Sequence, residues 1–111
     1  ANEVSNTLKF DYECDMIVCL SHLGLKYKSE KVSDLKVAEN SSYIDLIIGG
    51  HTHSFLENSI FINNQINKKV VVSQAGYGGI KLGRLDFIFN KKNKISKVIS
   101  TLENIKSLNF S

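Results

Sequence analysis

All three histidines of the chain follow apolar runs. His22 comes just after the run MIVCL, and His51 and His53 come just after the run DLIIGG. Apolar runs of this length between polar residues are typical of strands that are buried on both faces. Ligands of open α/β sheets gather at the carboxyl ends of the strands, and neutral imidazole is the commonest side-chain ligand of divalent transition metals. The sequence therefore predicts that His22, His51 and His53 bind metal.

A pair of glycines, Gly49 and Gly50, precedes His51. Glycine lets the backbone turn tightly and lets another group approach it closely. The competing interpretation is that the three histidines are polar loop residues with no joint role, which their matching positions at strand ends disfavour. Three imidazoles would also suit a mononuclear zinc site, but such a site leaves unexplained a sheet that this chain cannot cover.

The carboxylates of the chain are poorly placed to complete a metal site. Asp15 and Asp45 come before the two apolar runs, so a strand of about 3.3 Å per residue puts them roughly 20 Å from the imidazoles. Glu30 and Asp34 lie in the loop and helix after His22, where solvated or capping roles are expected. We therefore expect the anionic ligands to come from outside this chain.

The elements that position the histidines alternate between helix and strand. We expect a helix over about the first dozen residues, with Val4 and Leu8 buried. A second helix is expected after the N-cap Ser33, with Leu35 and Ala38 buried. Strands are expected at residues 16–20, 44–50, 59–62, 68–76, 80–90 and 95–100. The tail, residues 100–111, fits no template and is expected to be poorly defined.

This order of elements predicts an α/β (α+β) fold in which a parallel strand-helix-strand unit passes into mixed or antiparallel strands. Two helices are too few to cover both faces of such a sheet. Residues 1–111 are therefore expected to form a single partial domain, a piece of a larger one.

Composition excludes several classes of protein. The 111 residues are 42% hydrophobic and 23% charged, which is ordinary for a globular protein. The net charge of +3 is mild and dispersed, so we expect no nucleic-acid partner. No apolar run approaches the roughly 20 residues of a membrane span, and the first residues show no signal-peptide pattern.

Three segments together resemble the second half of a calcineurin-like metallophosphoesterase domain, and within that superfamily most closely the 5'-nucleotidases. They are SHLG, SDLKVAENSSYIDLIIGGHTHSFL and VVVSQAGYGGIKLGRLDFIF, and the likeness extends to about Ile99. It implies part of a four-layer αββα sandwich with its metal site at the ends of the central strands. It also implies two divalent metal ions, zinc, manganese or similar, that activate a water to hydrolyse a phosphoester. The first candidate substrate is a nucleoside 5'-monophosphate, followed by cyclic nucleotides and other phosphoesters.

The resemblance also implies which histidine binds which ion. Carried over, His22 and His51 hold one cation and His53 holds the other, although some nucleotidases have Asn or Gln in place of His53. The family's Asp-x-His motif, bridging aspartate and Gly-Asn-His segment are absent from this sequence, so an N-terminal half-domain has to supply them. Most nucleotidases of this branch act outside the cytoplasm, which favours the periplasm or the cell surface.

Two alternatives to an active hydrolase remain open. The chain is then either a catalytically inactive fragment that retains some metal-ligand histidines, or a structural or binding module whose histidines hold a partner chain. The glycine-rich turn of Gly76, Gly78 and Gly79 is either a phosphate cradle or a tight loop. The loop is favoured because no helix start follows it.

Overall fold

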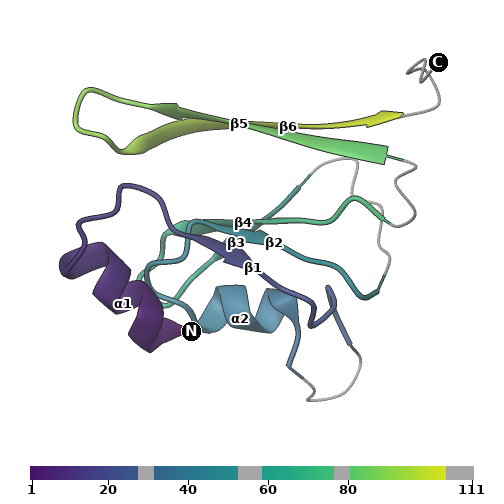
Figure 1. Ribbon diagram of the computed structural model, residues 1–111, viewed down its shortest axis with the longest axis horizontal. Helices are drawn as coiled ribbons and strands as arrows, with labels where there is room; N and C mark the ends of the chain where they lie inside the picture. Colours follow the sequence, from purple (N-terminus) through teal and green to yellow (C-terminus); the bar gives the residue numbers. More distant parts are fainter. Residues whose placement is uncertain (28–31, 53–58, 77–80, 105–111) are drawn as a thin grey trace.

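The computed structural model describes residues 1–27, 32–52, 59–76 and 81–104, and its elements form three layers (Figure 1). Two helices lie on one side of a four-stranded sheet, and a β-hairpin lies on the other side. The elements are α1 (Asn2–Phe10), β1 (Val18–Leu20), α2 (Asp34–Asn40), β2 (Leu46–Ile48), β3 (Ile60–Asn63), β4 (Lys69–Ser73), β5 (Lys81–Phe89) and β6 (Ile95–Asn104).

The four-stranded sheet has the order β1-β2-β4-β3. Strands β1, β2 and β4 are parallel to one another, whereas β3 pairs antiparallel with β4, and β5 pairs antiparallel with β6 in the hairpin. This confirms the predicted passage from a parallel unit into antiparallel strands. Strand β6 continues to Asn104, past the expected strand end at residue 100.

The hydrophobic core lies between the helices and the sheet. Its buried members include Ile47, Val70 and Val72 of the strands and Ala38 of α2, and Leu35 packs against them as expected. Helix α2 begins after Ser33, whose hydroxyl accepts a hydrogen bond from the Lys36 backbone N–H at 3.4 Å. Ser33 is therefore the N-cap, as its sequence position predicts.

Helix α1 differs from expectation in the face that it buries. Leu8 packs against the core as predicted, but the prediction for Val4 is wrong because its side chain is 63% exposed. Ser5 is buried instead. Around the helix Leu8 lies between Val4 and Ser5, and the buried face is on the Ser5 side, so Leu8 is partly covered while Val4 lies at the exposed edge. Neither this helix nor the other helix of the described residues is long and apolar enough to cross a bilayer.

The sheet face opposite the helices is only partly covered. One row across that face comprises Val18, Leu46, Val71 and Phe61. The two central members, Leu46 and Val71, are buried, whereas Val18 and Phe61 on the edge strands are exposed. Leu20, nearer the carboxyl end of β1, is 79% exposed. Strands β1 and β2, which were expected to be covered on both faces, are thus better covered on the helix side than on the opposite side.

Candidate metal centre

Two of the three histidines lie side by side at one rim of the sheet. Strand β1 ends at Leu20 and β2 ends at Ile48, and the two strands are parallel neighbours. The turns that follow them therefore leave the sheet together. His22 Nε2 lies 3.3 Å from His51 Nδ1, and the ring centroids are 4.9 Å apart with the ring planes at 64°. Both side chains are exposed. His53 lies outside the described residues.

The turn that carries His51 is held by Gln74, which follows the third parallel strand, β4. Gln74 Nε2 donates to the Gly50 carbonyl oxygen at 3.0 Å, and Gln74 Oε1 accepts from the Thr52 hydroxyl at 3.2 Å. His51 itself has φ 69°, a left-handed conformation that is unfavourable for a residue with a Cβ. Gln74 is 2% exposed. Its buried amide thus holds the residues on both sides of His51, Gly50 through its carbonyl and Thr52 through its side chain, a role that the sequence did not indicate.

The turn that carries His22 is held by Ser21. The Ser21 backbone N–H donates to the Ile48 carbonyl at 2.9 Å, which ties the turn to β2. The Ser21 hydroxyl accepts from the Leu23 backbone N–H at 3.2 Å and donates to Asp34 Oδ1 at 2.5 Å. One hydroxyl therefore closes the turn around His22 and anchors it to the first residue of α2.

Asp34 corrects an expectation from the sequence. A solvated or capping carboxylate was predicted there, but the residue is 0% exposed and Ser33 provides the cap. Its Oδ2 atom is buried and has no hydrogen-bond partner among the described residues. Burial raises the pKa of the Asp34 carboxyl, and the Ser21 hydrogen bond offsets part of that rise. An unsatisfied buried polar atom costs about 1–3 kcal/mol, so this carboxyl needs an explanation. Glu30, the other residue of that prediction, lies outside the described residues.

Asp45 has the structural role predicted for it. Its Oδ2 atom accepts a hydrogen bond from the Ile17 backbone N–H at 2.8 Å, at the end of the sheet where the parallel strands begin. Burial raises the pKa of Asp45, and the Ile17 N–H and nearby lysines reduce that rise. The carboxylate links the starts of two strands and takes no part in the histidine rim.

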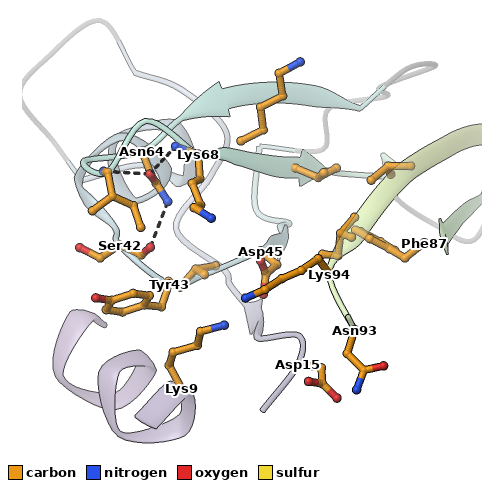
Figure 2. Close-up of a pocket in the computed structure, with 16 residues that line it drawn as sticks. Lys9, Asp15, Ser42, Tyr43, Asp45, Asn64, Lys68, Phe87, Asn93 and Lys94 are labelled. Atoms are coloured by element: carbon orange, nitrogen blue, oxygen red, sulfur yellow. Dashed lines mark hydrogen bonds between the residues drawn. The ribbon is translucent and has the colours of Figure 1, made fainter. Parts of the chain in front are cut away.

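A cavity of about 380 Å³ also lies at the end where the parallel strands begin, between α1, the sheet and the β5–β6 hairpin (Figure 2). Lys9, Lys68 and Lys94 come to it from three different parts of the chain, around Asp45. Neither His22 nor His51 lines it. The histidine site is instead an open rim.

The separation of the two imidazoles fits a shared metal ion. Nitrogen ligands bound at roughly 2.0–2.1 Å in a tetrahedral arrangement are about 3.3 Å apart, the separation of His22 Nε2 and His51 Nδ1. Within residues 1–27, 32–52, 59–76 and 81–104, no group of three or more His, Cys, Asp or Glu gathers as if to hold a metal ion. The described part of the chain therefore offers a pair of ligands. Of the three glycines in the glycine-rich turn, only Gly76 is described, with φ 78°.

Comparisons with known proteins find relatives that match most of this chain. No protein-family model matches the sequence. It is 31% identical over 102 residues to the trifunctional nucleotide phosphoesterase protein YfkN of Bacillus subtilis, covering 92% of this chain and 6% of that protein. It is 30% identical over 106 residues to an apyrase of Tabanus yao, covering 82% of this chain and 18% of that protein. The chain thus spans less than a fifth of either curated relative.

A solved structure has the same fold as this chain over part of its length. The crystal structure of a 5'-nucleotidase precursor from Thermus thermophilus matches with a TM-score of 0.79 and 25% identity. The match covers 93% of this chain and 21% of that one. The arrangement of helices, sheet and hairpin described above is therefore the fold of one part of that protein.

Proposed function

We propose that this chain, which has the sequence pattern and the fold of one part of the 5'-nucleotidases, supplies histidine ligands to a metal-dependent phosphoester hydrolase. The observation that carries the proposal is the convergence of His22 and His51 at a nitrogen–nitrogen distance of 3.3 Å. The residues come from turns after two parallel strands, where a sheet of this kind places its ligands. The proposed substrate is a nucleoside 5'-monophosphate, supported by the names of the relatives.

His22 and His51 would hold one divalent cation through Nε2 and Nδ1, and His53 would hold the second. Metal ions bound there would supply a Lewis acid that activates water and neutralises charge on the phosphoryl oxygens. An imidazole binds a cation through a ring nitrogen that carries no proton, so His22 would bind as the tautomer with its proton on Nδ1 and His51 as the tautomer with its proton on Nε2. Ser21 and Gln74 keep the two turns in place, so that little reorganisation is needed when the cation binds.

The remaining ligands would come from a second half-domain, which the sequence predicts and the geometry accommodates. Within the described chain β1 is an edge strand, and the adjacent Leu20 is largely exposed on the incompletely covered face. A further strand beside β1 would cover this edge and bring its own carboxyl end to the histidine rim. We use "complete domain" for this chain together with that half-domain. A periplasmic or cell-surface location is proposed from the resemblance alone.

The test is turnover of a nucleoside 5'-monophosphate by the complete domain with added Mn²⁺ or Zn²⁺. We expect His22→Ala and His51→Ala each to lower the rate at least about 100-fold, since each removes a ligand of the same ion. Lys97→Ala, on an exposed residue of β6, is the matched control and should leave the rate unchanged. Normal turnover by His51→Ala with its usual metal content would refute the assignment. Metal uptake without turnover by the unsubstituted complete domain would instead favour an inactive metal-binding module.

A further inference from the structure

A buried carboxyl lies between the two histidine turns. Asp34 Oδ1 accepts a hydrogen bond from Ser21, the residue before His22. Asp34 Oδ2 lies against Gly49, which begins the turn that leads to His51. The carboxyl thus touches both turns at once, one through a hydrogen bond and the other through direct packing on the backbone.

The second contact explains why glycine stands at position 49. A Cβ atom built on Gly49 would overlap Asp34 Oδ2 and would lie 3.3 Å from Gln74 Nε2. Any side chain at this position would therefore push β2's turn away from α2. At Gly83 in β5, by contrast, a Cβ atom would meet only Ala75 at 3.7 Å, an ordinary contact. Among the described glycines, close approach to Asp34 is specific to Gly49.

We propose that Asp34 is a positioning residue that holds the His22 turn and the His51 turn at the separation a shared metal ion requires. The inference rests on the proposed function, because it assigns Asp34 to the same metal site. Buried polar atoms of a residue that only fills the core are normally hydrogen-bonded. Asp34 Oδ2 is buried and has no hydrogen-bond partner among the described residues, so core packing alone does not explain this carboxyl. Outer carboxylates and hydrogen bonds that orient ligands commonly change metal affinity by about 10–100-fold when they are removed.

The chain offers a matched control for a purely structural carboxylate. Asp45 is partly buried and accepts one hydrogen bond, from the Ile17 backbone, but it lies at the other end of the parallel strands. Asp34→Ala and Asp45→Asn each change a buried or partly buried carboxyl and should each alter stability. A loss of metal affinity should follow from Asp34→Ala and not from Asp45→Asn.

The experiment measures Mn²⁺ affinity by titration calorimetry of the chelator-treated complete domain, together with its thermal unfolding midpoint in chelator. We expect Asp34→Ala to weaken Mn²⁺ binding at least about tenfold. Asp34→Asn keeps the shape and the acceptor for Ser21, so it should bind within about threefold of the unsubstituted protein. Asp45→Asn and Gly83→Ala should lower affinity by less than about twofold. The visible spectrum of bound Co²⁺ reports the ligand geometry and should change in Asp34→Ala but not in Asp45→Asn.

Gly49→Ala tests the same contact from the other side and does not depend on the folding of Asp34→Ala. Alone it should weaken Mn²⁺ binding at least about tenfold, because the new methyl overlaps Asp34. In the Asp34→Ala background the same substitution should cost less than about threefold more, since the overlapping atoms are gone. Unchanged affinity in both Asp34→Ala and Gly49→Ala overturns the proposal, as does equal loss in Asp34→Ala and Asp45→Asn. If the unsubstituted complete domain binds no divalent metal, the proposed function itself is refuted. That result differs from one in which the unsubstituted protein binds metal and the Asp34 variants bind it equally well.

Discussion

Gln74 and Thr52 are joined by a 3.2 Å hydrogen bond that spans the ends of two parallel strands. The other end of the same amide binds the Gly50 carbonyl, so the two bonds enclose His51. Three adjacent parallel strands, β1, β2 and β4, therefore meet at the histidine rim, although only two of them are followed by a histidine in the described residues. The third contributes the residue that fixes the second histidine's turn.

The first prediction concerns this amide. Gln74→Met keeps the length of the side chain and removes both hydrogen bonds, leaving the Gly50 carbonyl without this buried donor. We expect the complete domain to lose about 1–3 kcal/mol of unfolding free energy and to bind Mn²⁺ several-fold more weakly. Gln65→Met is the matched control, because Gln65 is exposed and should change stability by less than about 0.5 kcal/mol. Urea unfolding and metal titration of both variants check the prediction, and equal effects in the two would contradict it.

The second prediction is a pH dependence that arises from Asp34. Burial raises its pKa in the folded protein above the unfolded value, so folding favours the protonated carboxyl. Its contribution to stability is complete below the unfolded pKa of about 3.9 and is lost as the pH rises through the folded pKa. Asp34→Asn cannot lose a proton, so the native protein should become less stable relative to this variant as the pH rises from about 4.

Unfolding free energies of the two proteins at a series of pH values, measured in chelator, check this sign. Asp45, whose pKa burial also raises, is present in both proteins and therefore cancels in the difference. A stability difference that stays constant over the range, or that moves in favour of the native protein as the pH rises, would show that Asp34 has no raised pKa.

The third prediction concerns the core beneath the site. Ile47 is 0% exposed in the central strand β2 and belongs to the hydrophobic core, beside Val72 of the neighbouring strand β4. Ile47→Ala should lower the unfolding free energy by about 2–5 kcal/mol, since it removes buried methyl groups and leaves a cavity. Ile66→Ala, in the exposed turn after β3, should cost less than about 1 kcal/mol. Similar losses in the two variants would mean that β2 is not the centre of the core.

The fourth prediction tests whether the incompletely covered face is closed in the complete domain. Leu20 is largely exposed in this chain but would be buried beside a further strand. Leu20→Lys should then cost the complete domain more than about 2 kcal/mol, because it buries an unpaired charge. Ile66→Lys should stay within about 0.5 kcal/mol. Thermal unfolding of both variants decides the matter, and a neutral Leu20→Lys would count against a second half-domain on that edge.

The elements and the meeting of His22 with His51 could be predicted from the sequence because both follow from local pattern. Apolar runs mark the strands, and parallel strands end at a common rim. The role of Asp34 could not be predicted in this way. A carboxylate just after an N-cap is commonly explained by the helix dipole, whereas its contacts with Ser21 and Gly49 depend on how α2 packs under the strand ends. The role of Gln74 could not be predicted either, because its hydrogen-bond partners lie more than twenty residues away in the sequence.

The face that a short helix buries could not be predicted from local sequence pattern either. In α1 both Val4 and Leu8 fit a helical stripe, but the structure half-buries Leu8 and buries Ser5 in place of Val4. The choice between neighbouring faces is decided by the sheet on which the helix packs. Val4 and Leu20 are apolar residues that remain exposed, so their burial likewise depends on which elements pack beside them and not on local sequence pattern.

The central claim is that His22 Nε2 and His51 Nδ1 bind one and the same cation. It is tested most directly by a crystal structure of the complete domain with Zn²⁺, using the anomalous signal at the zinc edge to locate the ion. The account predicts an anomalous peak about 2.0–2.1 Å from both of these nitrogen atoms. Zinc bound elsewhere, or two rings turned apart in the presence of zinc, would contradict it.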